Sequence, residues 1–207
     1  MKRLIVFIIL CIFYSSTISI CQDKNLSPEW VFDNKDEIKN WGGLNQLQPL
    51  VVDTVKNAKG EKVTVLKTVS IGSDPYVFPD GNWNGFLPGV QQPFDGKKYP
   101  IIYIGVRVNV SSTWQIYYVT DQDAVYSERQ RQNFQVNASD DFVDLQFKMT
   151  EGGWQEEEIR GFRLDPGTIA GVEAEIDYLS LRGIPGGKPK AVDYASKLAI
   201  TWGYIKK

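Results

Sequence analysis

Apolar and polar residues alternate strictly through the segment "PIIYIGVRVNV", residues 100–110. The apolar positions are Ile102, Ile104, Val106, Val108 and Val110, and the positions between them are Tyr103, Gly105, Arg107 and Asn109. Because successive side chains of a β-strand point to opposite faces, this pattern predicts a strand with one face in a core. Its other face is then turned toward solvent or a ligand.

The same interpretation extends over most of residues 28–183, where short segments are separated by Gly, Pro, Asn and Asp. Further strands are indicated by "EWVFD", "LVVDTV", "KVTVLKTVS", "TWQIYYVT", "DFVDLQFKMT", "GFRLD" and "EIDYLSL". About nine short strands at close spacing favour an all-β fold, an antiparallel two-sheet β-sandwich, over a parallel α/β sheet. In "EIDYLSL" the alternation changes phase between Tyr178 and Leu179, which predicts a β-bulge or a strand covered on both faces.

Histidine is absent from the 207 residues, and the only cysteines are Cys11 and Cys21. A chain without histidine lacks the usual general base near neutral pH and the commonest zinc ligand. Serine triads, Cys–His dyads and Cys/His zinc sites are therefore excluded. The formal net charge is −2 and no long basic block is present, which argues against a nucleic-acid partner.

The N-terminus has the pattern of a secretory signal peptide. Lys2 and Arg3 precede an apolar run from Leu4 to Tyr14, and small residues follow it. The run is too short to span a bilayer, so we expect residues 1–20 to be a signal peptide and no transmembrane span. The protein is then extracellular or lies at the cell surface. Cys21 is either the site of a lipid anchor or a free thiol near the start of a secreted chain.

The remaining chain divides into three expected parts. Residues 21–27 are polar and read as a flexible N-terminal segment, residues 28–183 as a single β-sandwich domain, and residues 184–207 as a linker and short C-terminal tail. Asn25, Asn109 and Asn137 each begin an Asn-X-Ser sequon, which matters only in a host that glycosylates.

Five segments in order resemble a known family. They are "WVFDNKDEIKNW", "SIGSDPYVFPD", "KYPIIYIGVRV", "WQIYYVTDQDAVYSE" and "IRGFRLDPGTIAGVEAEIDYLSL", and together they cover roughly residues 29–182. They resemble the galactose-binding-domain-like jelly roll, close to carbohydrate-binding modules attached to polysaccharide-degrading enzymes. The resemblance implies a two-sheet sandwich whose members often bind glycans, through a groove on one sheet or through loops at the rim. The loop aromatics of this chain match no ligand-specific motif of the family.

The family resemblance also implies a structural calcium ion near the paired first and last strands. Asp177 and Glu29 are the carboxylates that we expect there, because those two strands are adjacent in such a sandwich. Calcium requires several hard oxygen ligands, including carboxylates and backbone carbonyls. Arg163 and Asp165 stand two apart on one strand, hence on one face, and are predicted to form an ion pair or a hydrogen-bonded strand end.

Candidate glycan contacts follow from the aromatic and planar polar residues. Trp83 lies in a Gly/Asn-rich loop, "PDGNWNGF", where burial is not assured. Tyr103, Arg107, Gln115 and Tyr117 share the non-core phase of their strands and are predicted to line one sheet face. Tyr and Trp supply large contact area with few rotatable bonds. The alternative is that this face is covered by loops or by the tail.

The favoured function is a secreted, non-catalytic protein that recognises a polysaccharide or glycan by aromatic stacking and polar contacts. The alternative is a structural or adhesive cell-surface protein that uses the sandwich for protein contacts, and a minor alternative is a small polysaccharide-active enzyme. Glycoside hydrolysis needs two carboxylates held across the scissile bond. The adjacent residues Glu156, Glu157 and Glu158 alternate between faces and read as a solvated strand start, so no such pair is indicated.

Overall fold

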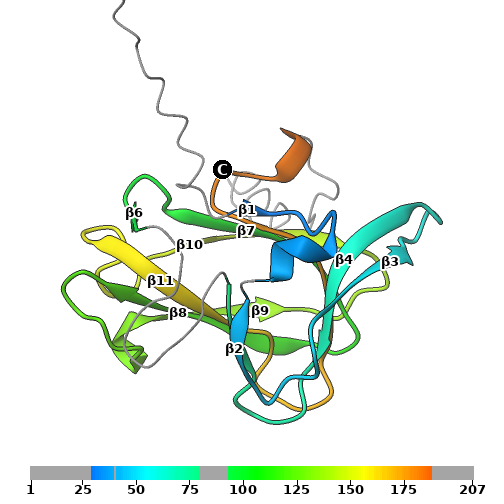
Figure 1. Ribbon diagram of the computed structural model, residues 1–207, viewed down its shortest axis with the longest axis horizontal. Coiled ribbons are helices and arrows are strands. Elements are labelled where there is room, and N and C mark those ends of the chain that lie inside the picture. The colour runs from blue at the N-terminus through cyan, green and yellow to red at the C-terminus, as the bar shows by residue number, and fades with distance from the viewer. Residues whose placement is uncertain (1–28, 40, 80–92, 188–207) are drawn as a thin grey trace, which may run out of the picture.

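The computed structural model describes residues 29–39, 41–79 and 93–187. In this part of the chain, two antiparallel sheets of six strands pack face to face, which confirms the predicted β-sandwich (Figure 1). The predictions on the signal peptide, Cys21, Asn25, Trp83 and the part of the C-terminal tail after Gly187 fall on residues outside the described ranges. None of the helices in these ranges is long and apolar enough to cross a membrane.

Sheet A has the strand order β10-β7-β12-β4-β3, and β1 pairs with β12. Its strands are β1 (Glu29–Trp30), β3 (Val51–Lys56), β4 (Lys62–Val69), β7 (Ile101–Val108), β10 (Val143–Lys148) and β12 (Glu173–Ser180). Sheet B has the order β2-β5-β11-β8-β9, and β6 pairs with β11. Its strands are β2 (Gly42–Asn45), β5 (Tyr76–Phe78), β6 (Phe94–Asp95), β8 (Ser112–Thr120), β9 (Arg131–Val136) and β11 (Glu158–Asp165).

The chain passes repeatedly from one sheet to the other, as in a jelly roll. The connections β4 to β5, β6 to β7, β7 to β8, β9 to β10, β10 to β11 and β11 to β12 all cross between sheets. In the described ranges, the 3₁₀ helices are η1 (Lys35–Ile38) between β1 and β2, η2 (Glu128–Gln130) between β8 and β9, and η3 (Pro185–Gly187) after β12. Where two consecutive strands lie in different sheets, as β7 and β8 do, their outward faces point to opposite sides of the molecule.

The predicted alternation matches the observed core. The apolar face of β7 is buried between the sheets, and on β8 the same is true of Trp114, Ile116 and Tyr118. Trp41 and Trp154 also belong to the core, so neither is available at the rim. Burial of aromatic side chains of this size is a large share of the apolar area that stabilises such a domain.

The phase change in "EIDYLSL" is a β-bulge, as predicted. Ile176 pairs with Val106 and Tyr178 pairs with Gly105, so Asp177 is the extra residue between them. Tyr178 therefore points out of the core, and its ring lies over Gly105, where a Cβ atom would collide with the ring. Its hydroxyl donates a hydrogen bond of 2.8 Å to an Asp144 carboxylate oxygen.

The β3–β4 hairpin folds over the outer face of sheet A. The backbone N–H of Ala58, in its turn, donates to Asp141 Oδ1 at 3.1 Å, just before β10 at the opposite edge of the sheet. Arg107 Nη1, on β7, donates to the Lys56 carbonyl at 2.8 Å. One strand, β12, separates β7 from the hairpin in the sheet order, so these bonds require the hairpin to cross above β12. The hairpin therefore covers the part of this face around Arg107.

Candidate functional site

Arg107 links the β3–β4 hairpin to strands β7 and β12 of sheet A. Its Nε donates to Glu175 Oε2 at 2.6 Å, Nη2 lies 2.5 Å from the same oxygen, and Nη1 donates to Lys56 and, at 3.5 Å, to the Asp140 carbonyl. The guanidinium carbon stands 4.7 Å from the centre of the Phe142 ring. These contacts use most of the donors of Arg107, so the structure gives this predicted ligand residue a structural role.

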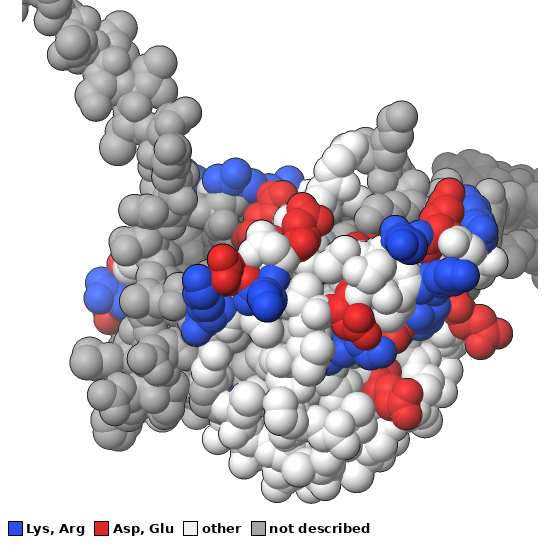
Figure 2. All heavy atoms as spheres, turned by 45° about the vertical axis from the view of Figure 1, so that its right-hand side comes forward, with Lys and Arg blue, Asp and Glu red and all other residues white. Residues whose placement is uncertain are grey.

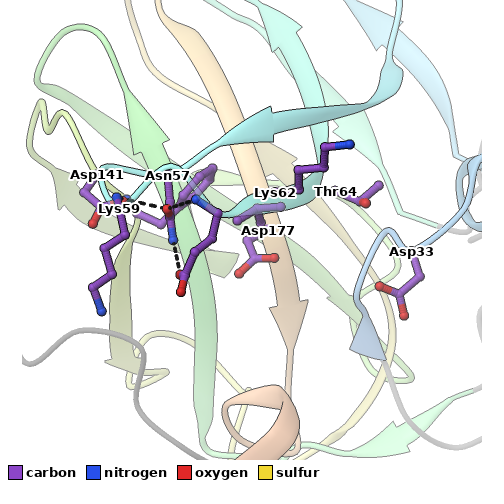
Figure 3. Close-up of a pocket in the computed structure, with 10 residues that line it drawn as sticks. Asp33, Asn57, Lys59, Lys62, Thr64, Asp141 and Asp177 are labelled. Carbon is purple, nitrogen blue, oxygen red and sulfur yellow. Dashed lines mark hydrogen bonds between the residues drawn. The ribbon is translucent and has the colours of Figure 1, made fainter.

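A hollow of about 610 Å³ opens beside the hairpin turn (Figure 3). The side chain of Asn57 organises the turn, since its Nδ2 donates to Glu61 and its Oδ1 accepts from the backbone N–H groups of Lys59 and Glu61. The lining combines acidic, basic, amide and apolar side chains: Asp33, Asn57, Lys59, Glu61, Lys62, Val63, Thr64, Asp141, Phe142 and Asp177. The hollow is thus polar and mixed in charge, and only Phe142 contributes an aromatic ring.

The two carboxylates predicted to hold calcium do not make a site by themselves. Asp177 lines the hollow from the bulge of β12. Glu29 pairs with Ser180 and does not line the hollow, whereas Asp33 does. Calcium takes six to eight oxygen ligands. Within the described ranges, no group of three or more Asp, Glu, His or Cys residues is placed to hold a metal ion. Calcium binding therefore stays a prediction of the sequence.

The outer face of sheet B carries a tyrosine–arginine stack. The guanidinium carbon of Arg163 lies 4.1 Å from the ring centre of Tyr76 and 4.3 Å from that of Tyr117. Arg163 donates two hydrogen bonds to the Asp165 carboxylate, at 2.7 and 2.5 Å, and a third to Asp74 at 3.1 Å. The predicted Arg163–Asp165 ion pair is confirmed. These bonds use Nε and Nη2, and no bond from Nη1 to a described residue accompanies them.

Planar polar side chains extend this stack across β8 and β9. Gln115 donates to Asn133 Oδ1 at 3.0 Å. The Tyr117 hydroxyl donates to Glu128 at 2.7 Å and accepts from Arg131 at 3.3 Å, and Arg131 also forms an ion pair with Glu128. We call this surface the Arg163 face, and it consists of Asp74, Tyr76, Gln115, Tyr117, Arg131, Asn133 and Arg163.

Burial shifts the ionisation of this face. Desolvation raises the pKa of Asp165 from 3.8 to about 6, and the hydrogen bonds and positive charge of Arg163 oppose that rise. Desolvation is also the main cause that raises the pKa of the Tyr117 phenol, so the phenol stays protonated at neutral pH and donates to Glu128. The face therefore combines the neutral phenol of Tyr117, which is 8% exposed, with amides and with charges that are already paired.

Replacing Asp165 with asparagine is expected to flatten the pH dependence of stability between about pH 4 and pH 6. In that window the folded state holds a proton on Asp165 that the unfolded state has lost, so the free energy of unfolding falls as the pH rises. The difference across the window is about 3 kcal/mol. Urea denaturation of the wild type and of Asp165→Asn at several pH values measures it. Parallel curves for the two proteins would contradict the shifted ionisation of Asp165.

The four strand residues predicted to bind a ligand do not lie on one face. Tyr103 and Arg107 are on β7 in sheet A, and Gln115 and Tyr117 are on β8 in sheet B. The prediction that they share a face is wrong, because the outer faces of the two sheets point in opposite directions. The structure brings Gln115 and Tyr117 together with the Arg163 stack. Trp83 lies outside the described residues.

Two aromatic and amide contributors were missed from the sequence. Tyr76 lies in β5, which has only three residues and is too short to show alternation. Asn133 lies in β9, whose sequence "RQNFQV" has few apolar residues. The only sequence signal for Tyr76 was its place in "SIGSDPYVFPD", one of the segments that resemble the jelly-roll family.

No family model matches the sequence, and no curated protein matches it. Among solved structures, an exo-β-agarase matches with a TM-score of 0.53 and 11% identity, over 84% of this chain. This chain spans only 30% of the agarase chain. A family 11 carbohydrate-binding module from Clostridium thermocellum, in complex with a β-1,3-1,4-mixed-linked tetrasaccharide, matches with a TM-score of 0.38 and 12% identity, over 75% of this chain and 95% of the module.

A further match is CsCBM6-3 from Clostridium stercorarium in complex with cellobiose, with a TM-score of 0.35 and 10% identity, over 66% of this chain and 86% of that one. Carbohydrate-binding modules recur among the matched structures. At these identities the likeness establishes the fold alone, a jelly-roll β-sandwich of the kind that the sequence resemblance implies.

Proposed function

We propose that this protein is a secreted, non-catalytic glycan-binding protein that recognises a polysaccharide through the Arg163 face. The observation that carries the proposal is the stack of Tyr76, Arg163 and Tyr117 on the outer face of sheet B. On sheet A the corresponding surface is crossed by the β3–β4 hairpin. The likeness of fold to part of an exo-β-agarase is in keeping with a polysaccharide ligand.

The chemistry of the Arg163 face suits a sugar. Tyrosine rings cover the C–H faces of sugar rings, and planar polar groups bond to sugar hydroxyls. After their mutual hydrogen bond, Gln115 keeps its amide oxygen as an acceptor and Asn133 keeps its amide nitrogen as a donor. Arg163 adds the donors of Nη1, held in place by the bonds that Nε and Nη2 make to carboxylates. A rigid donor array loses little entropy when a ligand binds.

The carboxylates at this face form ion pairs with its arginines, which favours binding over catalysis. Asp165 and Asp74 both bond to Arg163, and Glu128 pairs with Arg131. A glycosidase instead holds one protonated and one ionised carboxyl group about 5 to 9.5 Å apart across the scissile bond. Burial raises the pKa of Asp165 to about 6, but its two oxygens accept the bonds from Arg163 and are not free to protonate a leaving group.

A role in protein contacts is the second candidate, and one surface favours it. The loops at the lower end of Figure 1, residues 46–50, 70–73 and 166–171, contain no Asp, Glu, Lys or Arg. The lower part of the surface in Figure 2 is correspondingly free of charged side chains. Ile71 and Ile169 are 61% and 44% exposed there. Exposed apolar residues on an uncharged end are a feature of protein interaction surfaces.

Affinity electrophoresis against soluble neutral polysaccharides tests the proposal. Tyr76→Ala is expected to lower the affinity measured by retardation up to about tenfold, since a stacked aromatic side chain contributes about 0.5 to 1.5 kcal/mol to such contacts. Tyr103→Ala is the matched control, because Tyr103 is a half-buried tyrosine on the outer face of the opposite sheet. Trp83→Ala tests in the same gels the predicted contribution of Trp83.

Loss of retardation in Tyr103→Ala with no change in Tyr76→Ala would place the glycan on sheet A instead. Absence of retardation by every polysaccharide, together with loss of a protein partner in Ile71→Asp, would favour the structural or adhesive role. Release of sugar products by the purified protein would make it an enzyme.

A further inference from the structure

We infer that the Arg163 face selects uncharged glycans and rejects sulfated and uronic ones. This inference rests on the proposed function and concerns the same surface. Its basis is the pairing of every cationic group that the strands of sheet B carry. An anionic polysaccharide is recognised by arginine or lysine side chains whose charge is free to meet a sulfate or carboxylate.

The strands of sheet B contain arginine but no lysine. Their three arginines each form an ion pair: Arg131 with Glu128, Arg160 with Glu158 at 3.0 Å, and Arg163 with both Asp74 and Asp165. Three guanidinium groups are thus matched by four carboxylates. The field at this surface is neutral to negative, so an approaching anion is repelled, even where the Nη1 donors of Arg163 remain, because the adjacent carboxylates already balance the charge.

Sheet A, by contrast, carries cationic side chains that form no ion pair with a described residue. Lys56 and Lys62 stand on its strands and Lys59 in the hairpin turn between them, and none of the three forms an ion pair within the described residues. Free ammonium groups therefore lie on the side of the molecule where the hairpin covers the sheet. The side with the tyrosine stack carries none on its strands, so stacking and anion recognition are separated between the two faces.

The geometry of Arg163 fits a neutral hydroxyl acceptor. The guanidinium is fixed by two rings and two carboxylates, and the Nη1 donors remain beside Tyr76 and Tyr117. A sugar hydroxyl can accept from Nη1 and donate to a neighbouring carboxylate at the same time, whereas a sulfate can only accept. The adjacent donor and acceptor therefore match an uncharged diol better than an ester sulfate.

Competition in affinity gels tests this selectivity on the same face. A neutral polysaccharide that retards the protein, from a panel of agarose, barley β-glucan and galactomannan, is cast in the gel. Soluble neutral fragments of that polysaccharide are expected to restore mobility. Fragments of κ-carrageenan and of polygalacturonate are expected to have no effect at the same concentration. Equal competition by the anionic fragments would overturn the inference.

The double variant Asp74→Asn/Glu128→Gln removes one of the two carboxylates that pair with Arg163 and the carboxylate that pairs with Arg131. It is expected to gain at least about fivefold in affinity for the anionic fragments, because two negative charges leave the face. Asp33→Asn/Glu173→Gln, which makes the same change in net charge on the sheet A side, is the control and is expected to gain nothing. Thermal unfolding confirms that both variants fold.

The outcomes separate the inference from the proposed function. Retardation by the anionic polysaccharides with none by the neutral ones would overturn the selectivity and keep glycan binding. A double variant as selective as the wild type would show that the ion pairs do not set the selectivity. No retardation by any member of either set would overturn the proposed function, and the inference with it.

Discussion

Replacing Arg163 with methionine is expected to lower the free energy of unfolding at pH 8 by about 3 to 5 kcal/mol, the usual cost of breaking a buried ion pair on one side. Asp165 is 1% exposed and receives two hydrogen bonds from Arg163. Without the guanidinium, its carboxylate is left buried with no cation to bond to it. The rings of Tyr76 and Tyr117 also lose the group packed between them.

The pH dependence of the stability lost in Arg163→Met distinguishes an unpaired buried carboxylate from lost packing as its cause. In Arg163→Met the pKa of Asp165 is expected to rise further above its wild-type value of about 6, because burial is no longer opposed by a positive charge. A carboxyl group whose folded pKa is raised destabilises the folded state most at high pH. Urea denaturation should therefore show a smaller loss at pH 5 than at pH 8. An equal loss at both values would mean that packing dominates the effect.

Two further variants control this experiment. Arg163→Met/Asp165→Asn removes the buried charge together with its partner and is expected to recover a large part of the stability. Arg160→Met makes the same substitution on the same strand at an ion pair whose side chains are 47% and 46% exposed. It is expected to cost less than about 1 kcal/mol, as exposed pairs do. A cost for Arg160→Met equal to that of Arg163→Met would contradict the role of burial.

The sequence was sufficient for features that depend on neighbours along one strand. The alternation in β7 and β8 identified their core faces, the phase change in β12 indicated a bulge as one of two alternatives, and the spacing of Arg163 and Asp165 placed them on one face. Each of these follows from the period of two in a β-strand, because that period decides which side chains share a face.

The sequence was not sufficient for features that join distant segments. Alternation distinguishes core from outer face but does not say to which sheet a strand belongs, so Arg107 and Tyr117 were wrongly expected on one surface. The stack joins Arg163 to Tyr76 and Asp74, which come from a strand of three residues and the turn before it. Strands as short as β2, β5 and β6 carry too few residues to show any period.

Replacing Arg107 with methionine is expected to lower the free energy of unfolding by about 2 to 3 kcal/mol, as losses of hydrogen bonds to charged groups do. Arg107 joins three segments at once, since it bonds to Glu175 on β12, to the Lys56 carbonyl at the end of β3 and to the Asp140 carbonyl before β10. Its side chain is 20% exposed and that of Glu175 is 18% exposed, so water replaces these bonds poorly.

The substitution should loosen the β3–β4 hairpin before it unfolds the sandwich. Hydrogen exchange is the measurement, and the expected result is loss of protection at the Ala58 amide, which bonds to Asp141 across the sheet, while β8 stays protected. Lys67→Met is the matched control, because Lys67 pairs with the same Glu175 at 3.4 Å but is 40% exposed. It is expected to cost less than about 1 kcal/mol. Unchanged protection of Ala58 in Arg107→Met would show that the hairpin keeps its place over sheet A without this arginine.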